Sequence, residues 1–175
     1  VYTAQTRDKA LKKLVEEQFY WINRSPFRRL LTPNRSGKIL PRLSNGSEHL
    51  AWANGSRWSI DAPTEDAGHG DSLGLTVGDE IYAQRDARLE AAFLPATTAV
   101  PDAQSIWIST VGKAKESSPF LWGKVEAGRN RVDLARMDPR FLDIHRTLYV
   151  EYSAPADADW RDPMTWWETM PALGY

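Results

Sequence analysis

The chain has 175 residues, of which 42% are hydrophobic and 26% charged, values that exclude wholesale disorder and collagen-like repeats. Its 22 Lys and Arg are matched by 23 Asp and Glu, so the net charge of −1 gives no overall attraction to a polyanion. The absence of cysteine excludes disulfide frameworks, thiolate metal sites and cysteine nucleophiles. No apolar run approaches the roughly 18 residues of a membrane-spanning helix, so we expect no membrane partner.

Both ends of the chain look cut. The segment Val1 to Thr6 has the pattern of a strand that begins abruptly, and residues 171–175 stop without a polar tail. We therefore expect a fragment of a longer protein. A helix is expected next, capped by Thr6 and running to about Asn23, because apolar residues recur there at helical spacing.

A loop-rich stretch and a β-hairpin follow this helix. Residues 24–47 are punctuated by proline and glycine, which predicts a loop. Two short strands are expected over His49–Ala53 and Arg57–Ala62, joined by the favoured turn pair Asn54-Gly55.

The rest of the chain alternates between strands and helices. In order, we expect a buried strand over Leu73–Val77, a helix over Asp86–Thr97, a strand over Ser105–Ser109, a helix over Ser118–Gly128, a strand over Thr147–Tyr152 and a short helix from Asp162 to Thr169. Such alternation predicts an α/β fold with a largely parallel sheet.

Two adjacent acids, Asp79 and Glu80, follow the first of these buried strands. Ligands of a parallel α/β sheet bind beyond the carboxyl ends of the strands, so the strand delivers both acids to that edge. Nucleoside triphosphate hydrolysis needs one acid to hold hydrated Mg²⁺ and another group to deprotonate the attacking water. Adjacent acids point in different directions and can divide these roles. The alternative is an ordinary strand end with solvated acids.

Ser109 and Thr110 stand at the end of the next strand, after an intervening helix. A strand–helix–strand connection sets the two strand ends side by side on one edge. Small hydroxyl side chains there can hydrogen-bond a γ-phosphate or the water and transmit its loss. The alternative is a Ser/Thr turn that closes a strand.

These two segments resemble paired motifs of tailed-phage large terminase subunits. The segment from Gly68 to Glu80 resembles the family's Walker B region, and Ser109-Thr110 looks like its coupling motif. Other stretches agree in the right order along nearly the whole chain. Val1–Thr6 and the helix after it are similar to the strand and helix that follow the family's P-loop. Asn54–Ile60 is similar to its central hairpin. The segments similar to the exit from its ATPase domain are Glu151–Pro155, Asp162–Trp167 and Pro171–Gly174.

The resemblance implies part of an ATP-driven motor that packages double-stranded DNA into a procapsid. Residues 1–152 would form a partial RecA-like core of the ASCE P-loop NTPase class, a mainly parallel sheet flanked by helices with a β-hairpin insertion. Residues 153–175 would form an exit segment toward a nuclease domain. Asp79 would hold Mg²⁺ through water, Glu80 would activate the water that attacks ATP, and Ser109 and Thr110 would couple hydrolysis to movement.

The same resemblance implies the partners and the location. The partners would be double-stranded DNA, the portal protein, the small terminase subunit and further copies of the protein in a ring. The location would be the cytoplasm of the bacterial host, with the motor docked on the procapsid portal.

The sequence departs from the family's pattern at the P-loop. A working P-loop reads GxxxxGK[ST], because backbone N–H groups cradle the phosphates and the hydroxyl reaches Mg²⁺. The pair Gly37-Lys38 precedes Ile39 and no clear helix, so we reject it, and we expect the isolated chain to bind nucleotide poorly and to be inactive. A second departure is Gly78, where the family usually has a branched apolar residue; glycine there can loosen the strand tip.

Six basic residues and no acid lie within residues 24–42; they are Arg24, Arg28, Arg29, Arg35, Lys38 and Arg42. They are candidates for contacts with DNA phosphates or a neighbouring subunit, and one can serve as an arginine finger. The alternative is a solvated basic loop. His69, on the loop before the acidic strand, is a candidate for a contact with the γ-phosphate.

Two other functions stay open. A helicase or another DNA-directed ASCE NTPase would share the acids and hydroxyls but should carry further nucleic-acid motifs downstream, which are not found. A non-catalytic α/β module could instead bind DNA or a protein through the basic loop. In that case Glu80→Gln would change nothing, whereas in an ATPase it would abolish hydrolysis.

Overall fold

The computed structural model describes residues 1–68, 70–111, 115–141 and 146–170. The chain divides into two compact units, Val1–Gly123 and Lys124–Tyr175. The functional boundary expected after residue 152 stays a prediction. Within the described ranges, no helix combines the length and the apolar character needed to cross a membrane.

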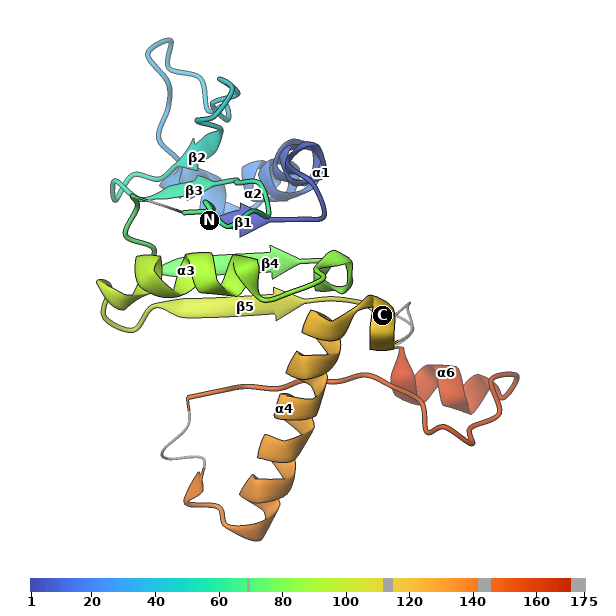
Figure 1. Cartoon of the computed structure of the whole chain (residues 1–175). Helices are drawn as coiled ribbons and strands as arrows, with labels where there is room; N and C mark the ends of the chain where they lie inside the picture. The colour runs from blue at the N-terminus through green and yellow to red at the C-terminus, as the bar shows by residue number, and fades with distance from the viewer. Residues whose placement is uncertain (69, 112–114, 142–145, 171–175) are drawn as a thin grey trace. The chain divides into compact units, whose positions relative to one another are not determined.

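The first unit contains a three-stranded parallel sheet in the order β1-β4-β5 (Figure 1). Its strands are β1 (Tyr2–Thr3), β4 (Leu75–Asp79) and β5 (Gln104–Ile108). Val77 lies beside Tyr2 of β1, and Gly78 lies beside Trp107 of β5. Because all pairs are parallel, the three carboxyl ends meet at one edge of the sheet. The prediction of a mixed α/β fold with a parallel sheet is confirmed.

The first helical run packs on one face of the sheet. It comprises α1 (Arg7–Lys12), the π-helical segment η1 (Lys13–Phe19) and α2 (Tyr20–Arg24). Thr6 caps it, since its hydroxyl accepts a hydrogen bond from the Lys9 N–H at 3.3 Å. Leu14 is fully buried against Tyr2 and Val77. The predicted helix is therefore confirmed, with a π-helical middle that periodicity did not indicate.

Helix α3 (Arg88–Thr98) packs on the other face of the sheet. Leu89 and Phe93 are buried there with Val1 and Leu73, and the Trp107 ring packs against them. Val1 and Trp107 face this side because successive residues of a strand point to opposite faces: Val1 precedes Tyr2, and Trp107 lies level with Gly78 rather than with Val77.

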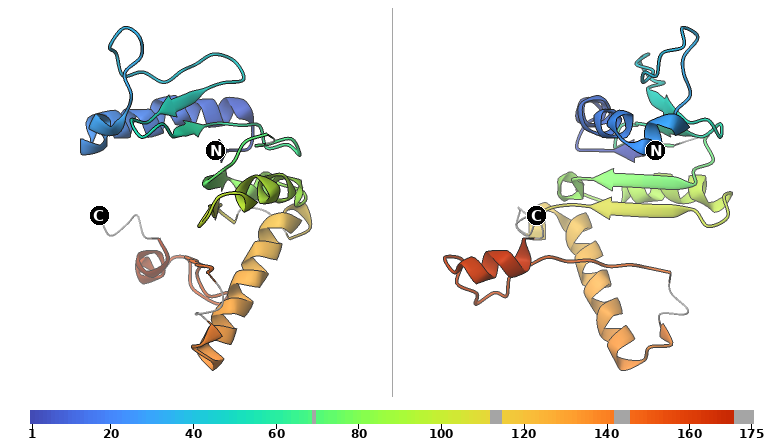
Figure 2. Two further views of the ribbon diagram at one scale, coloured as in Figure 1. Left: turned by 90° about the vertical axis from the view of Figure 1, so that its left-hand side faces the viewer. Right: turned by 180° about the vertical axis from the view of Figure 1, so that it is seen from behind.

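The predicted hairpin is confirmed, with shorter strands. Strand β2 (His49–Ala51) pairs antiparallel with β3 (Arg57–Ser59). Gly55 in the connecting turn has φ of 86°, a conformation that glycine adopts without strain. The 3₁₀ helix η2 (Pro26–Leu30) follows α2 within the loop-rich stretch, and Figure 2 shows the long connection that leads from it to the hairpin.

The C-terminal elements differ from two predictions. After the 3₁₀ helix η4 (Lys115–Ser117), helix α4 runs from Pro119 to Met137 rather than ending near Gly128, and α6 (Pro163–Thr169) is capped by Asp162 as expected. The strand expected over 147–152 is wrong, because residues 146–155 form no strand.

The extended segment lies instead beside α4, and no strand of the described residues pairs with it. The Tyr149 ring packs so closely on Gly128 that a Cβ there would clash with it. The Arg129 guanidinium holds Glu151 at 2.5 Å. Leu148 is left 88% exposed, so the alternating pattern here does not mark a half-buried strand.

Candidate functional site

The structure brings the predicted acids and hydroxyls together at the carboxyl edge of the sheet. Asp79 is the last residue of β4 and lies beside Ile108, the last residue of β5. Glu80 and Ser109 therefore follow on neighbouring strands, and the Tyr82 N–H donates to the Ser109 hydroxyl at 3.0 Å. Thr110 comes next and is exposed.

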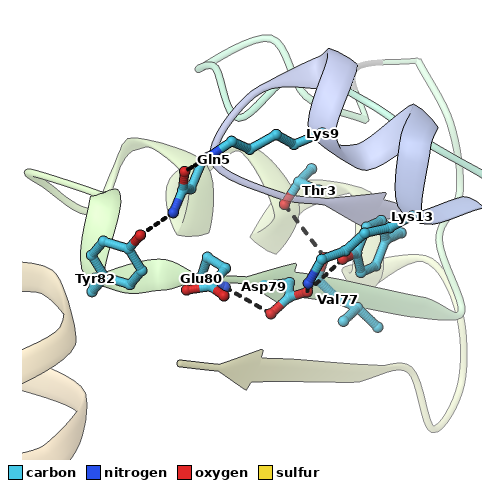
Figure 3. Close-up of polar contacts among 9 residues, drawn as sticks. Thr3, Gln5, Lys9, Lys13, Val77, Asp79, Glu80 and Tyr82 are labelled. Atoms are coloured by element: carbon cyan, nitrogen blue, oxygen red, sulfur yellow. Dashed lines mark hydrogen bonds and ion pairs between the residues drawn. The ribbon is translucent and has the colours of Figure 1, made fainter. Parts of the chain in front are cut away.

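The Asp79 carboxylate is held by three donors (Figure 3). Its Oδ2 accepts hydrogen bonds from the Lys13 Nζ at 2.6 Å and from the Tyr2 hydroxyl at 2.5 Å. Its Oδ1 accepts the Glu80 N–H at 2.8 Å. The Asp79 side chain is only 13% exposed, so these bonds are made in a partly desolvated place.

The surroundings determine the charge state of this cluster. Burial by itself raises the pKa of Asp79, but hydrogen bonds from Lys13 and Tyr2 outweigh it and hold the pKa below its ordinary value. The hydrogen bond to Asp79 raises the pKa of Lys13, and burial together with Asp79 raises that of Tyr2. At neutral pH Asp79 and Lys13 are therefore an ion pair, and Tyr2 is a protonated donor.

Glu80 adopts a left-handed backbone conformation, with φ of 57° and ψ of 42°. This conformation costs a residue with a side chain about 1–2 kcal/mol. It turns the chain into the 3₁₀ helix η3 (Ile81–Ala83) and places the Glu80 side chain away from Lys13 (Figure 3). Among the described residues the Glu80 carboxylate accepts no hydrogen bond, so it stays available to a water.

The turn after Glu80 is fixed through Tyr82. Besides the bond to Ser109, the Tyr82 carbonyl accepts a hydrogen bond of 2.8 Å from the fully buried Ser118 hydroxyl. The Gln5 amide donates to the Tyr82 hydroxyl, and Lys9 donates to Gln5. Elements on both sides of β4 thus hold the position of Glu80.

Sequence reasoning missed Lys13, Tyr2, Ser118 and Gln5 as residues of this site. Nothing in the sequence distinguishes Lys13 from the other charged residues of the first helix. Tyr2 belongs to the expected first strand, but nothing in the sequence indicates that its side chain points toward Asp79.

The donor set suits a cation held through water better than one bound directly. Within the described residues no three Asp, Glu or His side chains lie close enough to form a metal site. A carboxylate offers about four lone-pair positions, and three are taken at Asp79. Mg²⁺ keeps several waters and often uses one or two carboxylates with substrate phosphates. One position on Oδ1 is left for such a water, and Oδ2 would open to a second one only if Lys13 moved away.

The basic segment is a separate feature of the first unit. All six of its basic residues are exposed, and within the described part of the chain none pairs with a carboxylate; they are Arg24, Arg28, Arg29, Arg35, Lys38 and Arg42. Arg28 and Arg29 line an open pocket of about 660 Å³. None of the six contacts Asp79 or Glu80.

Lys38 is not part of a phosphate-binding loop. Its backbone N–H donates to the Asn34 side chain at 3.0 Å, and no helix follows it. Gly37-Lys38 thus lacks the helix that follows the lysine of a P-loop. His69 and the Pro171–Gly174 motif lie outside the described residues.

No model of a known protein family, no curated protein and no solved structure matches this chain.

Proposed function

We propose that this chain is part of the ATPase of a tailed-phage large terminase subunit, in which ATP hydrolysis drives double-stranded DNA into a procapsid. One observation carries the proposal. Two adjacent acids at the end of β4 lie next to a hydroxyl residue at the end of β5, on the carboxyl edge of a parallel sheet.

The two acids have different surroundings, as a division of roles requires. Asp79 is fixed and ionised, which suits a residue that holds the water shell of Mg²⁺. Glu80 has no donor on its carboxylate among the described residues, which suits a base that orients and deprotonates water. ATP would supply the phosphoryl group and Mg²⁺ its charge neutralisation.

Ser109 fits the coupling role because it bonds the turn that carries Glu80. A change at Glu80 would reach β5 through the Tyr82 N–H. Thr110 is exposed at the same edge and is the second coupling residue of the proposal.

The arrangement is compatible with a partial RecA-like core. Strand β5 forms an edge of the sheet, with Ile106 and Ile108 exposed by 42% and 50%. Such an edge can pair with a further strand, and the proposal requires a P-loop segment to complete the site. DNA, the portal protein, the small subunit and a ring of copies are partners of the proposed whole protein.

The test is hydrolysis in a longer protein in which a GxxxxGK[ST] segment precedes Val1. We expect Glu80→Gln to abolish ATP hydrolysis while leaving ATP binding largely intact, because the amide keeps the shape but cannot accept the proton. Glu16→Gln is the matched control, since Glu16 is an exposed acid that pairs with Lys12 on the helix surface. Hydrolysis that survives Glu80→Gln would contradict the assignment of the base.

The coding sequence upstream of Val1 provides a cheaper first test. The proposal expects it to encode a GxxxxGK[ST] segment that follows a strand and opens a helix. An upstream sequence without such a segment would leave the site without phosphate-binding groups and would count against an ATPase.

The exposed basic segment favours a second candidate, a non-catalytic module that binds DNA. Replacing Arg28 and Arg29 by Glu should weaken DNA binding of the chain and lower the salt slope by about two. The control replaces Arg136 and Arg140, which pair with Asp133 and Asp138. The DNA-binding module would be favoured over the ATPase if the Arg28 and Arg29 variant lost DNA binding while Glu80→Gln left both DNA binding and ATP hydrolysis unchanged.

A further inference from the structure

Lys13 lies where the first helix changes its hydrogen bonding. Helix α1 ends at Lys12, and the π-helical segment η1 begins at Lys13. Short π-helical segments inside helices occur often at functional sites. At the residue where the helix changes from α- to π-type hydrogen bonding, the Lys13 Nζ lies 2.6 Å from Asp79 Oδ2, 66 positions away in the sequence.

The contact occupies the oxygen that a cation would otherwise approach. Oδ2 of Asp79 accepts both Lys13 and the Tyr2 hydroxyl, so its lone pairs are used. The negative charge of Asp79 is balanced by an ammonium from the chain itself. A second cation at this carboxylate would meet the Lys13 charge at close range in a partly desolvated place.

Lys13 is also able to leave. Its side chain is 31% exposed, whereas that of Asp79 is 13% exposed. The lysine stem has four flexible carbons, and the ammonium can move to solvent while the stem stays packed. Asp79, at the end of a central strand, has less freedom.

We propose that Lys13 is the internal counter-ion of Asp79 and that a divalent cation binds at Asp79 by displacing it. This inference rests on the proposed function for the identity of the cation. By linkage, a cation at Asp79 and the Lys13–Asp79 contact would weaken each other. Lys13 is a positioning residue, since it acts through Asp79.

The test is a titration of the isotopically labelled chain with Mn²⁺ alone, followed by paramagnetic broadening of the Asp79 and Glu80 amide signals. Mn²⁺ shares the oxygen ligands of Mg²⁺. We expect Lys13→Met to tighten Mn²⁺ binding at these amides about tenfold, the scale of one lost charge-assisted hydrogen bond to a competitor. Lys13→Arg, which keeps the charge, should restore wild-type binding.

Lys12→Met is the matched control. It removes the same charge from the neighbouring residue, whose side chain is 69% exposed and approaches Glu16 rather than Asp79. We expect its Mn²⁺ affinity at Asp79 to stay close to that of the wild type. Circular dichroism checks that each variant folds, and Lys13→Gln replaces Lys13→Met if the latter does not.

The outcomes separate this inference from the proposed function. Equal binding by the Lys13→Met and Lys12→Met variants, weaker binding by Lys13→Met, or no binding at Asp79 in any variant would overturn it. None of these results depends on ATP hydrolysis, so Glu80→Gln in the longer protein still tests the ATPase by itself. Tighter binding by Lys13→Met would support the inference even if that ATPase test failed.

Discussion

Gly78 is the residue of β4 whose replacement best tests the packing behind the acidic edge. A Cβ at Gly78 would lie 2.5 Å from each of two Trp107 ring atoms, Cε3 and Cζ3, and 3.4 Å from Ile81 Cγ2. The Trp107 ring has little room to move away. Its centroid lies 6.0 Å from that of the stacked Phe93 ring and 5.4 Å from that of the Phe120 ring, which is nearly perpendicular to it. Gly78→Ala should therefore displace the indole or the strand that carries it.

The expected cost follows from two opposing effects. Overpacking of a core costs about 1–3 kcal/mol. Replacing glycine by alanine in a regular element returns about 0.5–1 kcal/mol. We expect Gly78→Ala to lower the free energy of unfolding by roughly 0.5–2 kcal/mol, measured by urea denaturation. Gly123→Ala in α4 is the control, since a Cβ there meets nothing within 4 Å, and it should be neutral or stabilising.

A double-mutant cycle isolates the contact. In a Trp107→Leu background the ring that meets the new Cβ is gone, so Gly78→Ala should lose its cost or become stabilising. The reasoning is refuted if Gly78→Ala is neutral in the wild type, or if it costs the same with and without the tryptophan. The result also decides between two reasons for a glycine at position 78. A cost that depends on Trp107 would show that the close approach of the indole ring requires glycine. A glycine that only loosened the strand tip would give a cost independent of Trp107.

Two further predictions concern buried polar groups of the first unit. Glu48 is 3% exposed; burial raises its pKa, but backbone N–H groups and the Arg7 side chain bring it below the ordinary 4.5. The folded-state pKa thus lies below the unfolded one, so this stabilisation is complete above pH 4.5 and is lost as the pH falls through the folded value. Urea denaturation should show a smaller loss of stability on acidification for Glu48→Gln than for the wild type, and an equal loss would contradict the assignment. Ser118→Ala should cost about 0.5–1.5 kcal/mol, because the half-buried Tyr82 carbonyl loses the hydrogen bond from Ser118, while Ser72→Ala, at an exposed position, should cost nothing measurable in the same denaturation assay.

The order of elements and the meeting of the two strand ends were predictable from local pattern and from topology. Thr6 marks a helix start by its hydroxyl, and Asn54-Gly55 marks a hairpin turn, so both signals are local. Strands separated by one helix come together in parallel by a general rule, which placed Ser109 near Asp79 without any knowledge of side chains. The structure confirms each of these.

The partners of the site could not be read in this way. Lys13 and Asp79 are separated by 66 positions, and their contact depends on the register between β1 and β4 and on the π-helical segment. A lysine on a charged helical face has the same local pattern whether it meets solvent or a carboxylate. The prediction of a strand over 147–152 was wrong for a related reason. Alternating apolar residues indicate a preference for β structure, but they do not show whether a partner strand is available.

The turn at Glu80 explains why two adjacent acids can serve different ends. In a continuing strand, Asp79 and Glu80 would point to opposite faces of the sheet, and both would stay near the edge. The left-handed conformation of Glu80 instead ends β4, returns its own N–H to Asp79 Oδ1 and starts the turn that Ser109 and Ser118 hold through Tyr82. Asp79 becomes the neutralised, immobile acid and Glu80 the acid without a donor in the described part of the chain. A site that needs one acid to organise a cation and one to accept a proton requires this asymmetry, and here the backbone turn and the charge of Lys13 produce it.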